Sequence, residues 1–474
     1  MKKLLETSLY LLGPLAFIFV LLFPTEMPSN SQQFLAIFLL VISLWIFTDV
    51  PLFISGILGV TLSVILGIVS PLEAFSPFAD PIIFLFLGGF LLAHSLEMTE
   101  LDKRLAYKAL SHKLVQGSPQ KIVFSFLGLS FVLSMWISNT AAVAMLLPIS
   151  FGVLKKLKDS YAINSSRLEE QLLLGLAYSA TVGGNVTPIG SPPNIIAIGH
   201  LKNLAGIELG FLQWMAMALP FSLVVFYYIY RRVVSNISEE AFVQKAQEEF
   251  VDYKVLSKKQ KSVIIVFVST VFFWIVPNFL TIIFPNGSKF SLFLKENLSP
   301  PTVGIFFASL LFLLPLSSNE KVLSRRDTSQ IDWASLLLFG SGLSLGKILF
   351  KTGLSSYISS YISTLSGVSG EILLLIGIII FTIFFTELAS NTASANIIIP
   401  IMIAFGKEIG TSSLLITFVL ALACNSAYML PVATPPNVII YGTNKVKKAH
   451  MIRAGLWINL LCALVLSTVV ALFS

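Results

Sequence analysis

Charged residues are scarce in this chain. Only 12% of its 474 residues are Asp, Glu, Lys or Arg, against roughly 25% in an ordinary soluble domain, and 55% are hydrophobic. Cysteine occurs twice, at Cys424 and Cys462, in apolar segments that lie far apart in the sequence. This argues against a disulfide framework and against a thiolate metal site. The composition therefore excludes an ordinary soluble domain and favours a protein embedded in a lipid bilayer.

Basic residues outnumber acidic ones by 31 to 24, but their distribution does not favour a nucleic-acid partner. All but six of the 31 lie at Lys2 and Lys3 or in five connecting segments: 101–121, 155–169, 231–261, 317–332 and 445–453. If the N-terminus is cytoplasmic, all these segments fall inside, as the positive-inside rule requires. We therefore expect a multi-pass protein of the plasma (inner) membrane with its C-terminus outside.

Apolar runs of about 20 residues, the length of a membrane-spanning helix, recur along the chain. We expect spanning helices near 8–23, 33–48, 52–69, 81–99, 211–231, 262–284, 302–316, 333–350 and 453–473. Two further runs, 170–206 and 411–444, are interrupted by polar, Gly- and Pro-rich stretches and should be broken helices. The predicted fold is an all-α polytopic membrane protein with about eleven transmembrane helices.

One polar triplet appears twice, 252 residues apart (390 − 138), at the centres of long apolar segments. The copies are Ser138-Asn139-Thr140 and Ser390-Asn391-Thr392. Three neighbouring polar side chains in hydrocarbon are costly unless they are paired. The surrounding segments, 121–155 and 371–406, are too long for one crossing and too short for two. We expect two re-entrant hairpins, each with its triplet at the tip, one entering from inside and the other from outside. The two halves would form an inverted repeat.

A second motif is duplicated downstream of each triplet. The copies are Pro188-Ile189-Gly190-Ser191-Pro192-Pro193-Asn194 and Pro431-Val432-Ala433-Thr434-Pro435-Pro436-Asn437. Paired prolines end one helix and pre-set the first turn of the next. We therefore expect each broken helix to restart near the membrane midplane.

These paired motifs resemble the divalent anion:sodium symporters, including the INDY-type dicarboxylate transporters, over nearly the whole chain. The resemblance implies a homodimer of inverted-repeat subunits, with eleven helices and two hairpins, that works by an elevator motion. It implies substrate contacts from both triplets and from the hydroxyls of Ser191 and Thr434. It also implies two sodium sites, one formed by Ser134, Ser138, Asn139 and Gly190 and the other by Thr386, Ala389, Asn391 and Ala433.

The chemistry of the motifs agrees with those roles. An Asn side chain donates through its nitrogen and accepts through its oxygen, so Asn139 and Asn391 could hold both an anion and a cation. The motifs contain no Lys or Arg, so a dianion would depend on sodium and helix dipoles for charge balance. Sodium is the expected coupling ion, and no other cofactor is expected. Glu387 could relay protons, but a structural hydrogen bond within the hairpin is favoured.

The predicted division of the chain has five parts. Residues 1–110 are scaffold helices of the first repeat, 111–210 its transport part, 211–364 scaffold helices and a cytoplasmic connection, 365–450 the transport part of the second repeat, and 451–474 the final helix. The expected activity is sodium-coupled uptake of succinate, malate or fumarate. A sodium-independent dicarboxylate exchanger and a sulfate or tricarboxylate transporter remain as alternatives. A hydrolase is disfavoured because the motifs offer no nucleophile with a base.

Overall fold

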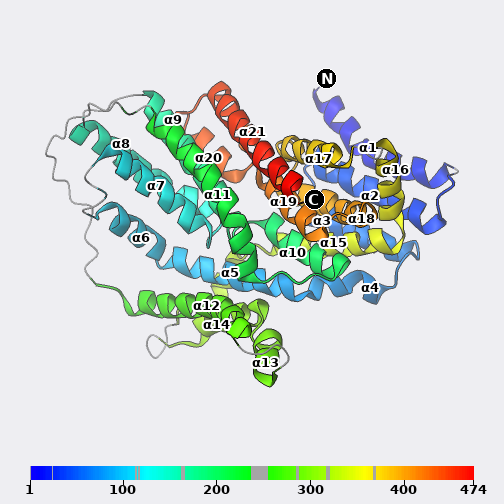
Figure 1. The fold of residues 1–474 in the computed structure, drawn as a ribbon, viewed down its shortest axis with the longest axis horizontal. Coiled ribbons are helices and arrows are strands. Elements are labelled where there is room, and N and C mark those ends of the chain that lie inside the picture. Colours follow the sequence, from blue (N-terminus) through cyan, green and yellow to red (C-terminus); the bar gives the residue numbers. More distant parts are fainter. Residues whose placement is uncertain are drawn as a thin grey trace.

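The protein is described by a computed structural model that covers residues 2–23, 25–112, 115, 118–161, 166–235, 237, 255–283, 288–315, 321–366 and 370–473. Over these ranges the fold is helical (Figure 1). The α-helices are α1 (Lys2–Leu22), α2 (Ser29–Phe47), α3 (Leu52–Ile65), α4 (Pro71–Phe75), α5 (Pro81–Met98), α6 (Leu101–Leu110), α7 (Pro119–Ser134), α8 (Asn139–Tyr161), α9 (Ser166–Gly183), α10 (Pro192–Ala205), α11 (Phe211–Val234), α12 (Lys258–Ile283), α13 (Lys289–Asn297), α14 (Pro300–Leu313), α15 (Trp333–Lys351), α16 (Leu354–Ser366), α17 (Glu371–Thr386), α18 (Asn391–Glu408), α19 (Ser413–Asn425), α20 (Pro435–Gly442) and α21 (Lys448–Phe473). Two 3-10 helices, η1 (Ser76–Ala79) and η2 (Arg325–Gln330), join them. The expected all-α architecture is confirmed.

Both expected hairpins are present as pairs of helices joined by a turn, and both expected broken helices are interrupted; the re-entrant course of the hairpins stays a prediction. The triplets lie where α7 turns into α8 and where α17 turns into α18. The first broken helix is interrupted between α9 and α10, and the second between α19 and α20. Pro192 and Pro435 are the first residues of the restarted helices, where a missing N–H removes no intrahelical bond.

Helix lengths decide which elements could cross a bilayer alone. Over the described residues, seven helical stretches are long and apolar enough to do so, and six further apolar helices have only 10–17 residues. The short ones include α7, α17 and α19, whereas α8, the other arm of the first hairpin, is among the seven long helices. The count of eleven crossings stays a prediction. Some helices begin earlier than expected, since α12 and α21 extend into their basic flanks.

Helix bounds repeat along the chain. The helix α17 begins and ends 252 residues after α7 (371 − 119 and 386 − 134), and α15 begins 252 residues after α5 (333 − 81). The two halves also interlock, because α10 packs against α18 and α19 while α20 packs against α8 and α9. In Figure 1, α20 accordingly lies beside α9, far in sequence from it. Each half therefore completes the environment of the other half's hairpin.

Helices α5 and α15 connect these interlocked elements to the remaining helices. An ideal Cβ on Gly88 of α5 would lie 2.7 Å from the backbone of Gly304 in α14. The equivalent contact packs α15 against α3. The opposite side of α15 meets α10 and α18, where a Cβ on Gly346 would lie 2.4 Å from His200 Cε1. The small residues of α15 thus allow close packing on both sides.

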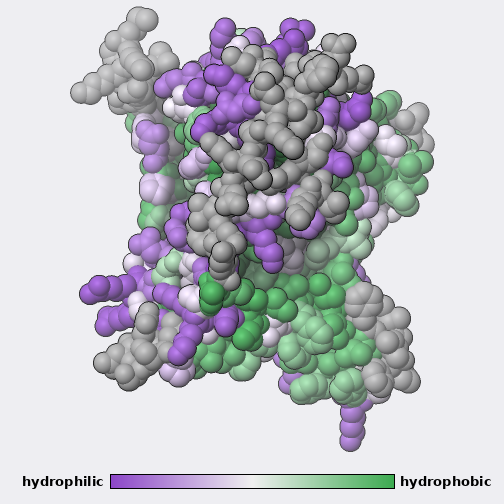
Figure 2. Space-filling view, turned by 90° about the vertical axis from the view of Figure 1, so that its left-hand side faces the viewer, coloured by the Kyte–Doolittle hydropathy of each residue, from purple (hydrophilic) through white to green (hydrophobic). Residues whose placement is uncertain are grey.

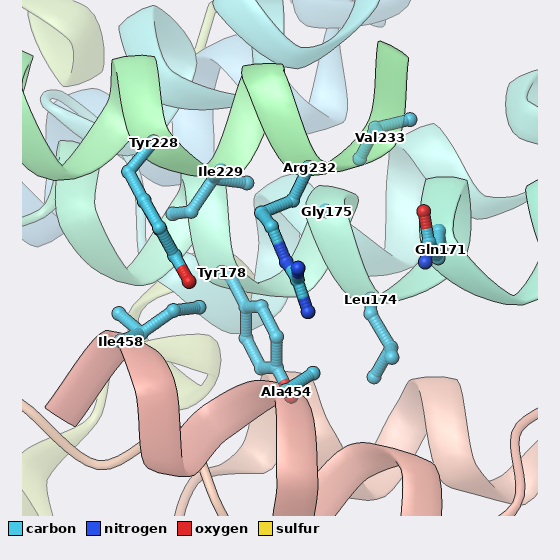
Figure 3. Close-up of a pocket in the computed structure, with 10 residues that line it drawn as sticks. All are labelled: Gln171, Leu174, Gly175, Tyr178, Tyr228, Ile229, Arg232, Val233, Ala454 and Ile458. Atoms are coloured by element: carbon cyan, nitrogen blue, oxygen red, sulfur yellow. The ribbon is translucent and has the colours of Figure 1, made fainter. Parts of the chain in front are cut away.

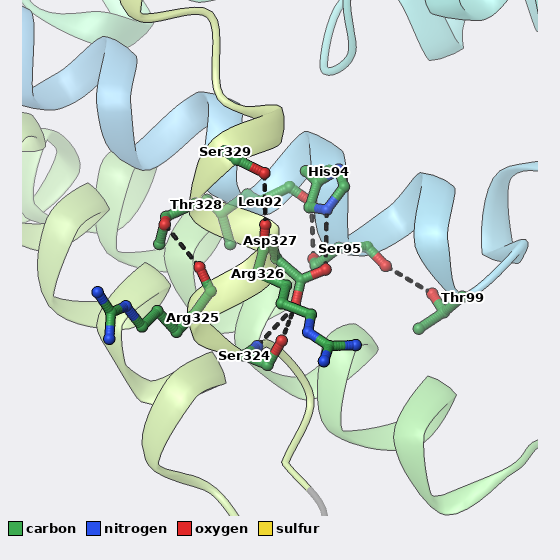
Figure 4. Close-up of polar contacts among 10 residues, drawn as sticks. All are labelled: Leu92, His94, Ser95, Thr99, Ser324, Arg325, Arg326, Asp327, Thr328 and Ser329. Carbon is green, nitrogen blue, oxygen red and sulfur yellow. Dashed lines mark hydrogen bonds and ion pairs between the residues drawn. The ribbon is translucent and has the colours of Figure 1, made fainter.

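Polar contacts hold the ends of α5 and α15 to short helices of the opposite half. His94 Nε2 of α5 lies 3.3 Å from Asp327 Oδ1 of η2, whose other oxygen accepts from Ser324 (Figure 4). At the end of α15, Lys351 Nζ lies 2.7 Å from both carboxylate oxygens of Glu73 in α4. The two halves use different side chains for the same kind of attachment.

The molecular surface carries apolar side chains where lipid is expected. On the face shown in Figure 2, hydrophobic residues gather in the lower centre, with hydrophilic ones above them and at the lower left. On α12 and α14, Ile265, Phe272 and Phe306 are more than half exposed. Large exposed apolar side chains are unfavourable in water and favourable against acyl chains.

Candidate functional site

The tip of the first hairpin is held together by hydrogen bonds of its own polar side chains. Ser134, the last residue of α7, donates its hydroxyl proton to Oδ1 of Asn139, the first residue of α8 (2.5 Å). Ser138 Oγ accepts from the N–H of Ala141 (3.1 Å) and so caps α8. Ser138 is exposed, whereas Asn139 and Thr140 are half-buried. The triplet therefore stands at a helix start, where backbone N–H groups lack intrahelical partners.

The tip of the second hairpin repeats this contact. Thr386 Oγ1, at the end of α17, lies 2.7 Å from Asn391 Oδ1 and 2.7 Å from the carbonyl oxygen of Cys424. Its single proton serves one acceptor at a time. The Ser134–Asn139 and Thr386–Asn391 pairs occupy positions 252 residues apart (386 − 134). The structure thus builds the same pair of oxygen atoms twice.

The backbone of the first break, between α9 and α10, lies close to the Asn139 side chain. An ideal Cβ on Gly184 would lie 2.4 Å from Asn139 Oδ1 and 2.9 Å from the carbonyl oxygen of Gly190. Three residues of the first expected sodium site, Ser134, Asn139 and Gly190, therefore lie together. These residues offer oxygen atoms (Ser134 Oγ, Asn139 Oδ1 and the Gly190 carbonyl oxygen), which suits a hard cation such as sodium.

The second expected sodium site is assembled less completely. Thr386 and Asn391 are joined directly, and the carbonyl oxygen of Cys424 is a third oxygen beside them. Ala389 lies in the hairpin turn and Ala433 in the second break, both outside helices. Carbonyl oxygens in such positions are not committed to a helical hydrogen bond, so the role of these two residues stays a prediction.

The asparagines of the Pro-Pro-Asn motifs shape the two breaks in the same way. Asn194 Nδ2 donates to the carbonyl oxygens of Gly184 (2.9 Å) and Thr187 (2.8 Å). Asn437 Nδ2 donates to the carbonyl oxygen of Leu430 (3.0 Å). Thr187 and Leu430 each stand seven residues before their asparagine. Each asparagine side chain therefore stabilises the conformation of the non-helical backbone that precedes it.

Asn425, which the sequence analysis missed, joins the two halves. Its Oδ1 accepts from the Ser191 hydroxyl (2.6 Å), and its Nδ2 donates to Asn194 Oδ1 (2.8 Å). All three residues are at most 4% exposed. Thr434, the counterpart of Ser191, is also buried, and over the described ranges its hydroxyl has no hydrogen-bond partner. The available signal was a polar residue at the end of an apolar helix, directly before a break.

Glu387 binds the second break and not its own hairpin. Its buried carboxylate accepts from the backbone N–H groups of Tyr428 (2.7 Å), Met429 (2.8 Å) and Leu430 (2.9 Å). A fourth bond comes from Asn459 Nδ2 of α21 (2.7 Å). A structural hydrogen bond was expected within the hairpin, so its location is corrected. The reason is that the break leaves consecutive N–H groups outside a helix, and a carboxylate is a strong acceptor for them.

A small pocket lies apart from these motifs, between α9, α11 and α21 (Figure 3). Tyr228 and Arg232 reach into it from α11, toward α21. Tyr178 of α9 donates its hydroxyl to the carbonyl oxygen of Met451 (3.3 Å). None of the ten lining residues belongs to the expected site: Gln171, Leu174, Gly175, Tyr178, Tyr228, Ile229, Arg232, Val233, Ala454 and Ile458.

Two hairpins and two broken helices that collect oxygen atoms at their breaks define a membrane transporter. The chain belongs to the family described as the sodium:sulfate symporter transmembrane region, whose model matches residues 2–474. The resemblance to the divalent anion:sodium symporters is thereby confirmed. The protein is a multi-pass membrane transporter and not an enzyme.

Individual relatives cover nearly the same length. The sodium-dependent dicarboxylate transporter SdcS of Staphylococcus aureus (strain USA300) is 34% identical over 97% of this chain and 89% of its own. The protein of the same name from Staphylococcus saprophyticus is 33% identical over 97% and 90%. The crystal structure of the Alcanivorax borkumensis YdaH transporter is similar in fold, with a TM-score of 0.56 at 12% identity, over 94% of this chain and 98% of that one.

Proposed function

We propose that this protein carries C4-type dicarboxylates, such as succinate, malate and fumarate, across the plasma membrane together with sodium. The duplicated pairs Ser134–Asn139 and Thr386–Asn391 support this most. Each places a hydroxyl and an amide oxygen together, as a hard cation requires, while the amide nitrogen remains a donor suited to a carboxylate. The names of the two staphylococcal relatives point to the same ion and substrate class.

Charge balance gives a physical reason for coupling. The motifs hold no cationic side chain, and the helices that restart at them direct only partial positive charge at an anion. A dianion therefore binds well only when sodium ions are bound beside it. By linkage, substrate must raise sodium affinity by the same factor.

Uptake of labelled succinate into proteoliposomes tests this function. An inward sodium gradient should drive accumulation, and dissipating the gradient should abolish it. If uptake instead requires internal succinate and ignores sodium, the protein is a dicarboxylate exchanger. If succinate is ignored while sulfate or a tricarboxylate is accumulated, the substrate assignment is wrong.

The paired asparagines provide the matching variants. Asn139→Ala and Asn391→Ala should each abolish uptake in protein that still inserts and elutes as a single species. Asn297→Ala, at an exposed end of α13, is the control and should transport normally. Normal uptake by either motif variant would contradict the site.

We also propose that the hairpins and broken helices move as one body in a homodimer of inverted repeats, in the manner of an elevator. The close contact of α15 with α10 and α18 supports a boundary there. A cysteine at Val153 of α8, paired with one on α6, should crosslink in only one of the inward- and outward-favouring conditions. Equal crosslinking in both, with transport intact, would favour local gating of the hairpins.

A further inference from the structure

Ser191, Asn425 and Asn194 form a buried bridge of hydrogen bonds between the two halves. Backbone carbonyl groups fix the direction of each bond in it. Asn194 must direct Nδ2 toward Gly184 and Thr187, whose oxygens only accept. Its Oδ1 therefore faces Asn425 and takes an N–H from Nδ2 of that residue. Asn425 is left with Oδ1 toward Ser191, which must donate. The single hydroxyl proton of Ser191 is thus committed within the protein.

The other half of the repeat lacks this bridge. Asn425 stands nine residues before Thr434 (434 − 425), and the residue nine before Ser191 is Val182 (191 − 182). Valine has no polar atom to offer at the equivalent position. Accordingly, Thr434 Oγ1 and Asn437 Oδ1, the counterparts of the two atoms that Asn425 engages, have no partners within the described segments. One residue difference makes the two hydroxyls inequivalent.

We propose that Asn425 turns Ser191 into a hydrogen-bond acceptor toward the substrate, so that the site selects C4 dicarboxylates carrying a hydroxyl group. This rests on the proposed function and on the expectation, drawn from the resemblance, that the hydroxyls of Ser191 and Thr434 contact the substrate. A carboxylate only accepts, so it suits the uncommitted hydroxyl of Thr434. A substrate hydroxyl donates, and it suits the Ser191 oxygen, whose own proton points to Asn425.

A plain carboxylate at Ser191 would require a rearrangement. The hydroxyl would have to turn away from Asn425, leaving a buried amide oxygen without a donor, and such a group is costly to leave unsatisfied. A hydroxyl-bearing substrate avoids this loss. Asn425 is therefore a positioning residue, because it acts on the substrate only through Ser191.

Competition against labelled succinate uptake tests the preference in the wild-type protein. The competitors are malate, 2-methylsuccinate and succinate; 2-methylsuccinate matches malate in size but replaces the donor by a methyl group. Malate should inhibit at a concentration about tenfold lower than 2-methylsuccinate, the effect of one buried hydrogen bond. Equal inhibition by the two would overturn the proposal.

The variant Asn425→Val gives the second half the valine that the first half has at the equivalent position, Val182. The Ser191 hydroxyl proton then has no acceptor at residue 425. The malate advantage should fall to about twofold or less. Thr417→Val, a change from polar to apolar in the same helix at a buried hydroxyl without a described partner, should keep the full ratio. A tenfold ratio retained in Asn425→Val would refute the role of Asn425. If that variant does not fold, the wild-type ratio still decides.

Failure of the proposed function has a different signature. In that case wild-type proteoliposomes accumulate neither labelled succinate nor labelled malate with a sodium gradient. If both are accumulated but malate and 2-methylsuccinate inhibit equally, the function stands and the inference about Asn425 is wrong.

Discussion

Gly184→Ala should disable the first proposed sodium site through one added methyl group. Its Cβ would lie 2.4 Å from Asn139 Oδ1, 3.0 Å from Asn139 Nδ2 and 2.9 Å from the carbonyl oxygen of Gly190. Contacts of a Cβ atom closer than 3.0 Å essentially do not occur, so the amide must move away by at least 0.6 Å (3.0 − 2.4). The carbonyl group of Gly190 belongs to the backbone, so it cannot move away without a shift of the chain. Asn139 would then lose its alignment with Ser134.

A misplacement of about 1 Å in a functional site can lower a rate by about 100-fold. We therefore expect sodium-driven succinate uptake to fall by about 10- to 100-fold, with a higher sodium concentration needed for half-maximal rate. Overpacking should also cost about 1–3 kcal/mol of stability, so expression and thermal unfolding are measured in parallel. Gly152→Ala, in helix α8 of the first hairpin and with nothing within 4 Å of its Cβ, is the control. Wild-type sodium dependence in Gly184→Ala would refute this placement of Asn139.

Two further substitutions test other contacts. Glu387→Gln replaces a carboxylate that accepts three backbone N–H groups by an amide with one acceptor oxygen. The melting temperature in detergent should therefore fall by several degrees, and uptake should be lost. An unchanged melting temperature would argue that the contact is unimportant. Gly346→Ala places a Cβ 2.4 Å from His200 Cε1 and should slow uptake about tenfold by overpacking the contact of α15 with α10. The control Gly377→Ala, with open space around its Cβ, should not slow uptake. Equal rates for the two variants would argue that α15 does not lie at the boundary of the moving body.

The sequence predicted the elements whose signals are local. Paired prolines stop and restart a helix wherever they occur, so the starts of α10 and α20 at Pro192 and Pro435 could be read directly. Segment length predicted a turn inside each run of about 35 apolar residues, and a turn separates α7 from α8 and α17 from α18. The hydroxyl–amide pairs at the hairpin tips are local as well, since each joins residues five positions apart.

Contacts between distant residues could not be read in the same way. Glu387 was visible as an unusual charge, but its partners lie 41 to 72 residues further along the chain. Asn425 ends an apolar helix, where a small polar residue more often packs against a neighbouring helix than builds a site. Its partner Ser191 is 234 residues away and belongs to the other half. Only the interlocking of the two halves brings them together.

The repeat itself concealed the most specific feature of the site. Two motifs that match in sequence predict two equivalent hydroxyls, and such a site would suit a symmetric anion in either orientation. Asn425 and Val182 lie outside the matching motifs, yet they decide which hydroxyl can donate. A donor at Thr434 and an acceptor at Ser191 would give the site a polarity, so that an asymmetric substrate binds in one orientation. Specificity in a duplicated site therefore depends on the residues at which the two copies differ.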